Sequence, residues 1–325
     1  MNRIIRPPRG FTLIELAIAL TIVALVIGGL AVPMSKRIAE QQYIDTQSNI
    51  DKAMDALVGF AILNRRLPCP DVSTNAIDNR DGFEKTAGAP GAITGCSIGI
   101  AGTASNAVNY HSDPDGVSWG DLPWQTLGLT PPYNVDAWNN RLRYVVFTPL
   151  VTQVAPSVTC TNVTNPPTIG VGFQNLGCNT TITNITGGGQ IDIRCGNPST
   201  TTASSVAPGC PTTPAIAPYQ VTQSAVLVVY SMGANGYGAT SIVSLASLAN
   251  NAFTSARQTK FPDEAANAPE LDSGLTQAIA RDLRRQYVVR ARSDENSASG
   301  PYDDLVNYMS ANSLAAKLAN GGVWP

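Results

Sequence analysis

Residues 7–32 read PPRGFTLIELAIALTIVALVIGGLAV, in which the end of a basic leader is followed by a long apolar run. A single charged residue interrupts this run. As a helix rising about 1.5 Å per residue, the stretch from Phe11 to Val32 would be about 33 Å long. That length matches the roughly 30 Å hydrocarbon core of a bilayer. The first ten residues carry three arginines and no acid, and basic flanks stay on the cytoplasmic side of a membrane. The pattern predicts one membrane-spanning helix, with the rest of the chain exported.

The place of the cleavage site distinguishes this segment from an ordinary secretory signal. Such a signal has a shorter apolar core, followed by a cleavage site of small residues. Here the plausible cut, between Gly10 and Phe11, lies before the apolar run. Removal of residues 1–10 would leave the run on the mature protein as a transmembrane and assembly helix over residues 11–33.

Glu15 is the charged residue inside the run. A carboxylate at the centre of a membrane helix costs about 2.5 to 3.5 kcal/mol, so it calls for a partner. Cleavage would create a positively charged amine at Phe11, one helical turn from Glu15 in the same chain. Between staggered neighbouring helices the same pair would form in trans. Phe11 and Glu15 are therefore the predicted assembly residues.

The eight residues RGFTLIEL, 9–16, resemble the signature of type IV prepilins and type II secretion pseudopilins. Gly10 stands before the cut, Phe11 after it, and Glu15 at the fifth mature position. The resemblance implies cleavage and N-methylation of Phe11 by a prepilin peptidase, and assembly with other pilin subunits by an inner-membrane platform. Before assembly the chain would span the inner membrane once, with its C-terminus in the periplasm; afterwards it would lie in a periplasmic or cell-surface filament. An uncleaved signal anchor with a chance acid is the alternative.

Residues 34–66 continue as an amphipathic helix. Its apolar side chains fall near one face: Tyr43, Ile50, Met54, Leu57 and Ala61. Such a stripe is typical of a helix on which a globular domain packs. Pro68 and Pro70 predict that the helix ends near Arg66.

Residues 67–325 are expected to form an α+β domain, in which a small antiparallel sheet packs on the long helix. The β-prone runs are DAWNNRLRYVVF (136–147), taken as the first strand, AVLVVYSMG (225–233) and DDLVNYM (303–309). A short helix over residues 311–319 closes the domain. The first run resembles the Asp-x-Trp-Gly-Asn turn of major pseudopilins, with Asn139 in place of glycine, and the resemblance as a whole implies a pilin-like fold.

Two stretches between these runs carry weaker patterns. Residues 156–224 are rich in Thr, Asn, Gly and Pro, which predicts a long inserted loop that serves adhesion or partner selection, or that is a decoration without a binding role. In residues 261–295, the spacing of Leu271, Leu275 and Ile279 predicts a helix with one buried side. The arginines that follow are expected on a solvated face.

All six cysteines follow the apolar run, as expected for disulfides on the exported side of a membrane. Sequence leaves 15 connectivities open. The sequential one is favoured, and it pairs Cys69 with Cys96, Cys160 with Cys178, and Cys195 with Cys210. A zinc site is the competing interpretation, but the chain has no Cys-x-x-Cys pair and a single histidine, His111.

Calcium is the one cofactor that the sequence leaves open. Two short runs, DNRDG (78–82) and DPDG (113–116), place carboxylates beside glycines, although neither has the final Glu of a twelve-residue EF-hand loop. The weak candidate ligands are Asp78, Asp81, Asp113 and Asp115. Turn formation explains the same residues, so no cofactor is the default expectation.

Enzymatic and nucleic-acid-binding functions are not predicted. The run around Ser231 lacks the first glycine of a nucleophile elbow, and neither a Walker loop nor a dinucleotide-binding glycine pattern occurs. Loss of the leader would change the net charge from −2 to −5, because three arginines are removed, so the exported part is mildly acidic. We expect a filament subunit, with its length favouring a minor or adhesive pilin. The alternatives are a pseudopilin of a type II secretion system, and a membrane-anchored binding protein or enzyme that never polymerises.

Overall fold

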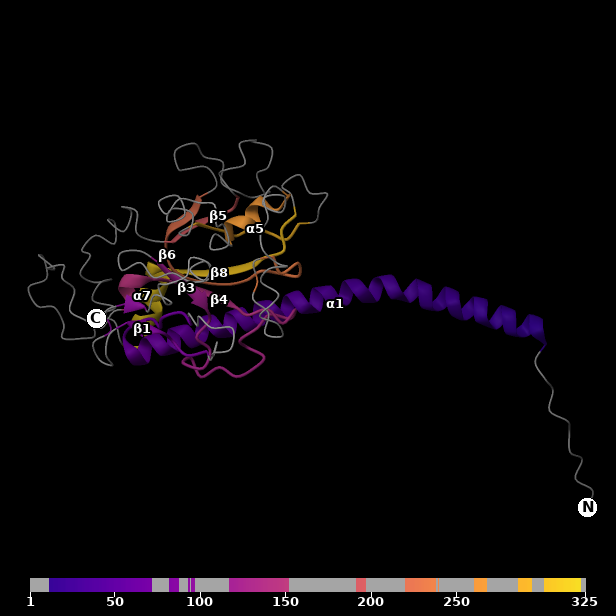
Figure 1. Ribbon diagram of the computed structural model, residues 1–325, viewed down its shortest axis with the longest axis horizontal. Coiled ribbons are helices and arrows are strands. Elements are labelled where there is room, and N and C mark those ends of the chain that lie inside the picture. Colours follow the sequence, from indigo (N-terminus) through magenta and orange to yellow (C-terminus); the bar gives the residue numbers. More distant parts are fainter. Residues whose placement is uncertain are drawn as a thin grey trace, which may run out of the picture. The chain divides into compact units, whose positions relative to one another are not determined.

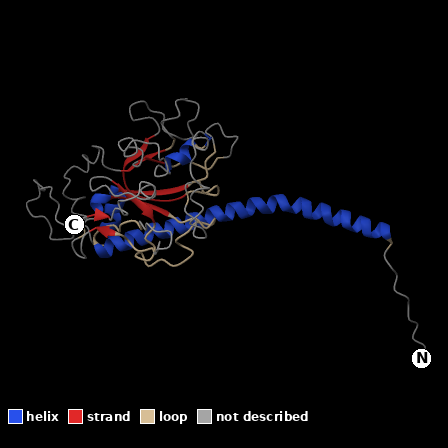
Figure 2. Cartoon of the chain, in the orientation of Figure 1, coloured by secondary structure: helices blue, strands red, loops and turns tan. Residues whose placement is uncertain are grey.

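The computed structural model describes residues 12–71, 82–87, 93, 95–96, 117–151, 191–196, 220–237, 239, 260–267, 286–293 and 301–322. The chain divides into two compact units, Met1–Asp45 and Thr46–Pro325. Helices and strands both occur in the second unit, in agreement with the predicted α+β class (Figure 2).

One helix, α1 (Leu13–Asn64), belongs to both units and continues without a break through Pro33 (Figure 1). The two predicted segments, residues 11–33 and 34–66, are therefore not separate helices, because their residues from Leu13 to Asn64 form a single one. Among the described residues, no helix combines the length with the apolar composition that crossing a membrane requires. The helix ends at Asn64, because Arg65 adopts a left-handed conformation with φ of 56° that closes the last turn.

The second unit is built on a six-stranded sheet. Its strands are β3 (Val117–Asp121), β4 (Arg143–Phe147), β5 (Ile191–Arg194), β6 (Gln220–Ser231), β7 (Gln286–Val288) and β8 (Leu305–Ser310). The order is β3-β4-β6-β5-β7, and β8, which lies off this path, also pairs with β6. All pairs are antiparallel except β5 with β7. A separate antiparallel ladder joins β1 (Thr86–Ala87) to β2 (Gly95–Cys96).

β6 is the central strand of this sheet. β4 and β8 flank its second half, while β5 pairs with its first half through two register shifts. Residues 225–231, AVLVVYS, are buried along their whole length. A strand that is covered on both faces has a continuous apolar sequence. That pattern allowed β6 to be predicted from the run at residues 225–233.

The predicted small antiparallel sheet is wrong in two respects. The sheet is mixed, because β5 and β7 are parallel, and the run taken as the first strand, which contains β4, is preceded by another strand of the sheet, β3. The predicted loop over residues 156–224 also contains the whole of β5 and the start of β6. Hydrogen bonding to neighbouring strands stabilises these short segments, so their own composition gave little indication of them.

Each face of the sheet is covered by helices and turns. On one face, α1 and α7 (Ala311–Asn320) pack on β4 and β6; the predicted helix over 311–319 is confirmed. The predicted apolar stripe lies in this interface, with Ile50, Met54, Leu57 and Ala61 buried. On the other face, Phe261 and the inward side chains of β3, β5 and β7 form a second cluster.

α5 (Pro262–Asn267) and β7 occupy part of the region where a helix with solvated arginines was expected. Leu271, Leu275 and Ile279 lie outside the described residues. Arg290 contradicts the prediction, because its side chain is only 2% exposed. Its Nε lies 2.6 Å from Asp263 Oδ2, and its guanidinium lies 4.7 Å from the ring centre of Tyr302. A carboxylate partner and an aromatic face allow this arginine to be buried.

Candidate functional site

Glu15 lies in the first turn of α1, where it forms a reciprocal cap with Thr12. Glu15 Oε2 accepts hydrogen bonds from Thr12 N at 2.9 Å and from Thr12 Oγ1 at 2.8 Å. In return, Thr12 Oγ1 accepts from Glu15 N at 3.3 Å. This is the capping-box arrangement, in which an N-cap side chain and the third helical residue satisfy one another's backbone N–H groups. The carboxylate thus has a partner in its own chain.

The predicted processing residues, Gly10 and Phe11, lie outside the described residues. The role of Thr12 was missed in the sequence, although the spacing Thr-x-x-Glu before an apolar run is the signal of a capping box. Both acceptor contacts of Glu15 use Oε2. Its other oxygen, Oε1, has no bonding partner among the described residues, so the cap leaves one carboxylate oxygen for a further donor.

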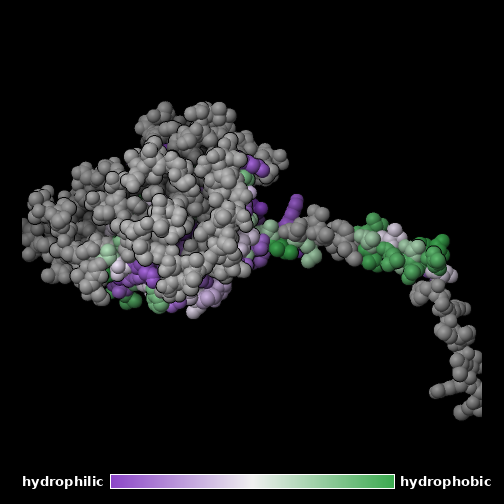
Figure 3. Space-filling view, in the orientation of Figure 1, coloured by the Kyte–Doolittle hydropathy of each residue, from purple (hydrophilic) through white to green (hydrophobic). Residues whose placement is uncertain are grey.

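The first turns of α1 present large apolar side chains to their surroundings. Figure 3 shows hydrophobic side chains gathered on the first turns of α1. The exposed ones are Leu13, Ile14, Leu16, Ile18, Leu20, Ile22, Val23 and Leu25, each more than half exposed. An exposed apolar surface of this kind marks a membrane or protein contact.

Further along α1, polar side chains fix the helix to the loop before β4. Asn49 Nδ2 donates to the carbonyl oxygens of Val135 and Pro132, at 2.9 and 3.3 Å. Thr46 Oγ1 accepts from Ala137 N at 3.0 Å. Both side chains are buried. Hydrogen bonds to backbone groups of one loop set the position of the helix on this domain more specifically than apolar packing alone.

The loop that these residues hold is the predicted pseudopilin-like turn, residues 136–140. Asp136 Oδ1 accepts from the N–H groups of Trp138 and Asn140, at 2.9 and 2.8 Å, and Oδ2 accepts from Ser231 Oγ at 2.7 Å. Burial raises the pKa of Asp136, and these hydrogen bonds oppose the rise. Asn139 has φ of 65°, a left-handed conformation that favours glycine and tolerates asparagine. Asparagine at this position is therefore compatible with the turn.

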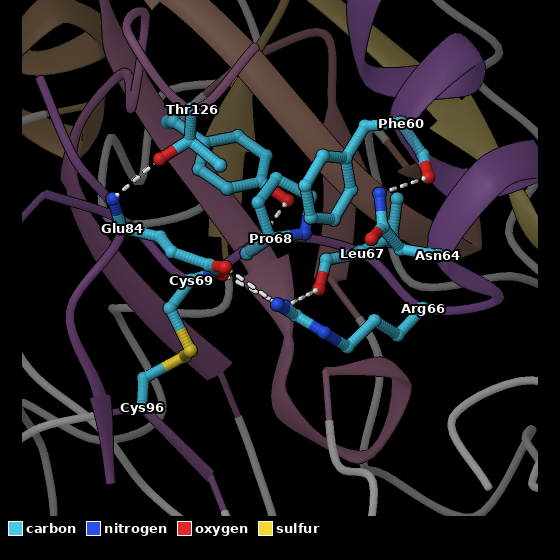
Figure 4. A network of polar contacts seen from close by, with 10 residues as sticks. Phe60, Asn64, Arg66, Leu67, Pro68, Cys69, Glu84, Cys96 and Thr126 are labelled. Atoms are coloured by element: carbon cyan, nitrogen blue, oxygen red, sulfur yellow. Dashed lines mark hydrogen bonds and ion pairs between the residues drawn. A yellow bond between two sulfur atoms is a disulfide. The ribbon is translucent and has the colours of Figure 1, made fainter. Parts of the chain in front are cut away.

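At the other end of α1, a buried ion pair holds the chain as it leaves the helix (Figure 4). Arg66 Nη1 donates to Glu84 Oε2 at 2.7 Å, and Arg66 Nη2 donates to Glu84 Oε1. Glu84 Oε2 also accepts from Cys69 N at 3.0 Å, and Glu84 N donates to Thr126 Oγ1 at 2.8 Å. The pair therefore joins the end of the helix to the segments before β1 and after β3.

Tyr144 of β4 lies beside this pair and donates to Pro68 O at 3.1 Å. Its pKa is raised well above the usual value, first by burial and then by the charge of Glu84, while Arg66 opposes the rise. The hydroxyl therefore stays protonated and remains a donor. Its bond connects the central sheet to the segment that follows α1.

Cys69 and Cys96 form the first predicted disulfide, which lies against the same network. Both residues are buried, and 27 positions separate them in sequence. Cys195 is also disulfide-bonded. Cys160, Cys178 and Cys210 lie outside the described residues, so the rest of the predicted connectivity stays a prediction.

Replacement of both Cys69 and Cys96 by serine is expected to lower the free energy of unfolding by about 3.5 kcal/mol. The estimate comes from the closure entropy of a loop of this length. Urea denaturation of the double variant and the parent chain measures the difference under oxidising conditions, which leave the other cysteines in the same state in both proteins. An unchanged denaturation midpoint would show that the disulfide adds nothing to stability.

The predicted calcium candidates Asp78, Asp81, Asp113 and Asp115 lie outside the described residues. Within the described parts of the chain, a different group of carboxylates comes together: Glu264 of α5 with Asp303 and Asp304, which precede β8. The sequence does not indicate this group, because Glu264 lies about forty residues from the two aspartates. The adjacent acids in YDDLVN are the one local signal for it.

Comparison with protein families finds the prokaryotic N-terminal methylation motif at residues 5–31. No curated protein and no solved structure matches the chain. The motif covers the predicted cleavage site, the residue predicted to be methylated and Glu15, and it confirms the resemblance seen in the sequence. The chain therefore carries, at its N-terminus, the processing signature of type IV prepilins and pseudopilins.

Proposed function

We propose that this protein is a filament subunit of the type IV pilin kind, cut by a prepilin peptidase after Gly10, methylated at Phe11 and polymerised through α1. The methylation motif at residues 5–31 is the observation that carries the proposal. The exposed apolar turns of α1 support it, because a polymer would bury them between subunits. The function is structural, with no catalytic role.

The apolar run over residues 11–33 supports a membrane stage before assembly. In the proposed pathway this segment spans the inner membrane once, and the domain after it lies in the periplasm. The three leader arginines favour that orientation. The assembly platform then moves the subunit from lipid into a filament in the periplasm or at the cell surface.

A pilin-like arrangement of the second unit is part of the proposal. It is supported by the packing of one helix, α1, on a sheet whose central strand is buried on both faces. The length of the chain and the inserted stretch between β4 and β6 favour a minor or adhesive pilin over the main subunit of a pilus.

A pseudopilin of a type II secretion system is the second candidate, and the turn at residues 136–140 favours it. Asn139 takes the left-handed conformation at the position where major pseudopilins have glycine. A membrane-anchored exported binding protein or enzyme, which never polymerises, is the alternative from another class. Such a protein would keep residues 1–10.

Replacement of Gly10 by valine tests the first step of the proposal. The variant is expected to keep its leader, because a branched side chain replaces the residue before the cut. Mass measurement of the amino terminus should find a chain that begins at Phe11, with an N-methyl group, for the parent and an unprocessed chain for Gly10→Val.

Gly59→Val is a matched control for that variant. Gly59 lies on the exposed side of α1, and a Cβ at this position meets nothing within 4 Å. The control variant should be processed like the parent. A parent chain that retains residues 1–10 in its native host would refute processing and, with it, the filament function.

A further inference from the structure

Two outer strands of the six-stranded sheet are closed by other parts of the chain. At the end of β3, Asp71 and Asp121 exchange backbone N–H···O bonds in both directions, each 3.0 Å long. At β7, Asn267 Oδ1 accepts from Val288 N at 2.7 Å, and Asn267 Nδ2 donates to Val288 O at 3.1 Å. The asparagine side chain thus takes the place of a neighbouring strand, which protects this edge.

β8 has no such cover in the described part of the chain. It pairs with β6 alone among the described strands (Figure 1). The backbone hydrogen bonds between other described segments do not involve Leu305–Met309. In an antiparallel ladder, alternate residues direct their N–H and C=O groups away from the partner strand. The outer side of β8 therefore offers these groups to a further strand.

The sequence of β8 also lacks the features that usually protect an edge strand. Charged residues, proline and bulges discourage pairing with another chain. Leu305–Ser310 reads LVNYMS, without a charge or a proline. The register shift in its pairing falls between Ala225 and Leu227 of β6. β8 is thus a regular, uncharged edge.

Side chains along β8 alternate between two surroundings. Met309 packs in the cluster formed with α1, and Asn307 Nδ2 on the same face donates to Asp51 Oδ1 of α1 at 3.0 Å. Val306 and Tyr308 are half-buried against the cluster on the other face. A strand added beside β8 would show the same alternation, with every second side chain on the side of α1.

The α1 side of this edge carries carboxylates. Asp51 is exposed, and its Oδ1 accepts from Gln47 Nε2 at 2.9 Å as well as from Asn307. Both bonds use Oδ1, so Oδ2 is available for a further donor. Asp55, one turn along α1, is 81% exposed and lies 3.9 Å from Lys317 Nζ. Lysine or arginine is therefore favoured at the positions of an added strand that face α1.

A second copy of β8 fits this edge poorly. Two antiparallel β8 strands would be related by a two-fold axis perpendicular to the sheet, which keeps α1 of both copies on the same face. Asn307 lies near the middle of β8, so the Asp51 carboxylates beside it would approach one another. Like charges placed opposite one another oppose such pairing.

We propose that the outer edge of β8 binds an extended segment of another protein, with basic residues on the α1 side and apolar residues on the side of Val306 and Tyr308. Hydrogen bonds from the main chain supply affinity in this mode of recognition, and alternate side chains supply specificity. The cations of the segment meet Asp51, and its apolar side chains extend the cluster behind β8. All of these residues belong to the second unit, so binding does not depend on filament assembly.

The probe is a fluorescent octapeptide of alternating lysine and valine, and binding to the purified full-length chain in detergent is measured by anisotropy. N-methylation of all lysine amides, or of all valine amides, removes the donors from one edge of the peptide only. One of these peptides should bind about tenfold or more weakly, and the other should bind like the unmodified one. Bound peptide should also slow deuterium uptake in Leu305–Met309.

Protein variants test the charge of the edge. Asp51→Asn should weaken binding about two- to fivefold, the usual range for an exposed ion pair. Asp45→Asn is the matched control and should bind like the parent, because Gln41 Nε2 donates to Asp45 Oδ1 at 2.8 Å as Gln47 donates to Asp51. The proposal is overturned if both N-methylated peptides bind alike, or if bound peptide leaves exchange in β8 unchanged. Protection of β8 that rises with protein concentration alone would also overturn it, in favour of a second copy.

Discussion

Glu15→Ala should yield a subunit that enters the membrane and is cleaved normally but is largely missing from sheared filaments. An uncompensated carboxylate in a membrane helix costs about 2.5 to 3.5 kcal/mol, so its retention indicates a partner. In the proposed filament that partner is the amine of Phe11 in a neighbouring subunit. If the pair contributes as little as about 1.4 kcal/mol, its loss weakens subunit addition about tenfold.

The capping box with Thr12 supplies a competing explanation for Glu15, and matched variants distinguish the two. Thr12→Ala removes the hydroxyl of the cap, which costs about 0.5 to 2 kcal/mol, but leaves the carboxylate in place. Glu15→Gln keeps a side-chain acceptor for Thr12 N and removes the charge. Pairing between subunits predicts that Glu15→Gln is nearly as defective as Glu15→Ala, whereas Thr12→Ala assembles better than both.

Quantitative immunoblotting of sheared fractions, normalised to the processed subunit in membranes, measures assembly in this series. Equal recovery of Glu15→Ala and the parent would eliminate the charge pair as the basis of polymerisation. Recovery of Glu15→Gln at the parent's level, with loss in Thr12→Ala, would show that Glu15 acts only as a helix cap.

The helical part of this fold was predictable because its patterns are local. The apolar run from Phe11, the stripe that includes Ile50 and Leu57, and the prolines after Arg66 each lie within a short window of sequence. α1 and the closing helix α7 follow from such windows. The central strand β6 was equally clear, since burial on both faces requires an uninterrupted apolar run.

β3, β5 and β7 were missed because their pairing is not local. Ile193 of β5 lies opposite Tyr287 of β7, more than ninety residues away, in the parallel pair of the sheet. Ile191–Arg194 is only four residues long and lies in a stretch rich in turn-forming residues. Such strands are stabilised by their neighbours, which a pattern within one segment does not reveal.

The distance in sequence between interacting residues also explains which functional residues could be predicted. Gly10, Phe11 and Glu15 lie within six positions, so their spacing alone identifies the processing signature. The carboxylate cluster joins Glu264 to Asp303 across about forty residues, and Arg66 reaches Glu84 across eighteen positions. Only the folded chain shows these contacts, although the acids and the arginine are visible in the sequence.

Arg66→Met should destabilise the second unit by about 3 to 5 kcal/mol, the usual cost of removing one partner from a buried ion pair. The side chains of Arg66 and Glu84 are 6% and 17% exposed. Without the guanidinium, the Glu84 carboxylate would keep one hydrogen bond, from Cys69 N, among those that the structure shows. Methionine has a similar length, so the loss reflects charge more than packing.

The double variant Arg66→Met with Glu84→Gln separates the two contributions. The glutamine side chain carries no charge and can still accept from Cys69 N, so the double variant should recover much of the stability lost in Arg66→Met. Urea denaturation of the four proteins that make up this cycle gives the coupling between the two side chains. A double variant no more stable than Arg66→Met would show that Arg66 acts through other contacts, namely its bond to Leu67 O and its packing 5.1 Å from the ring centre of Phe60.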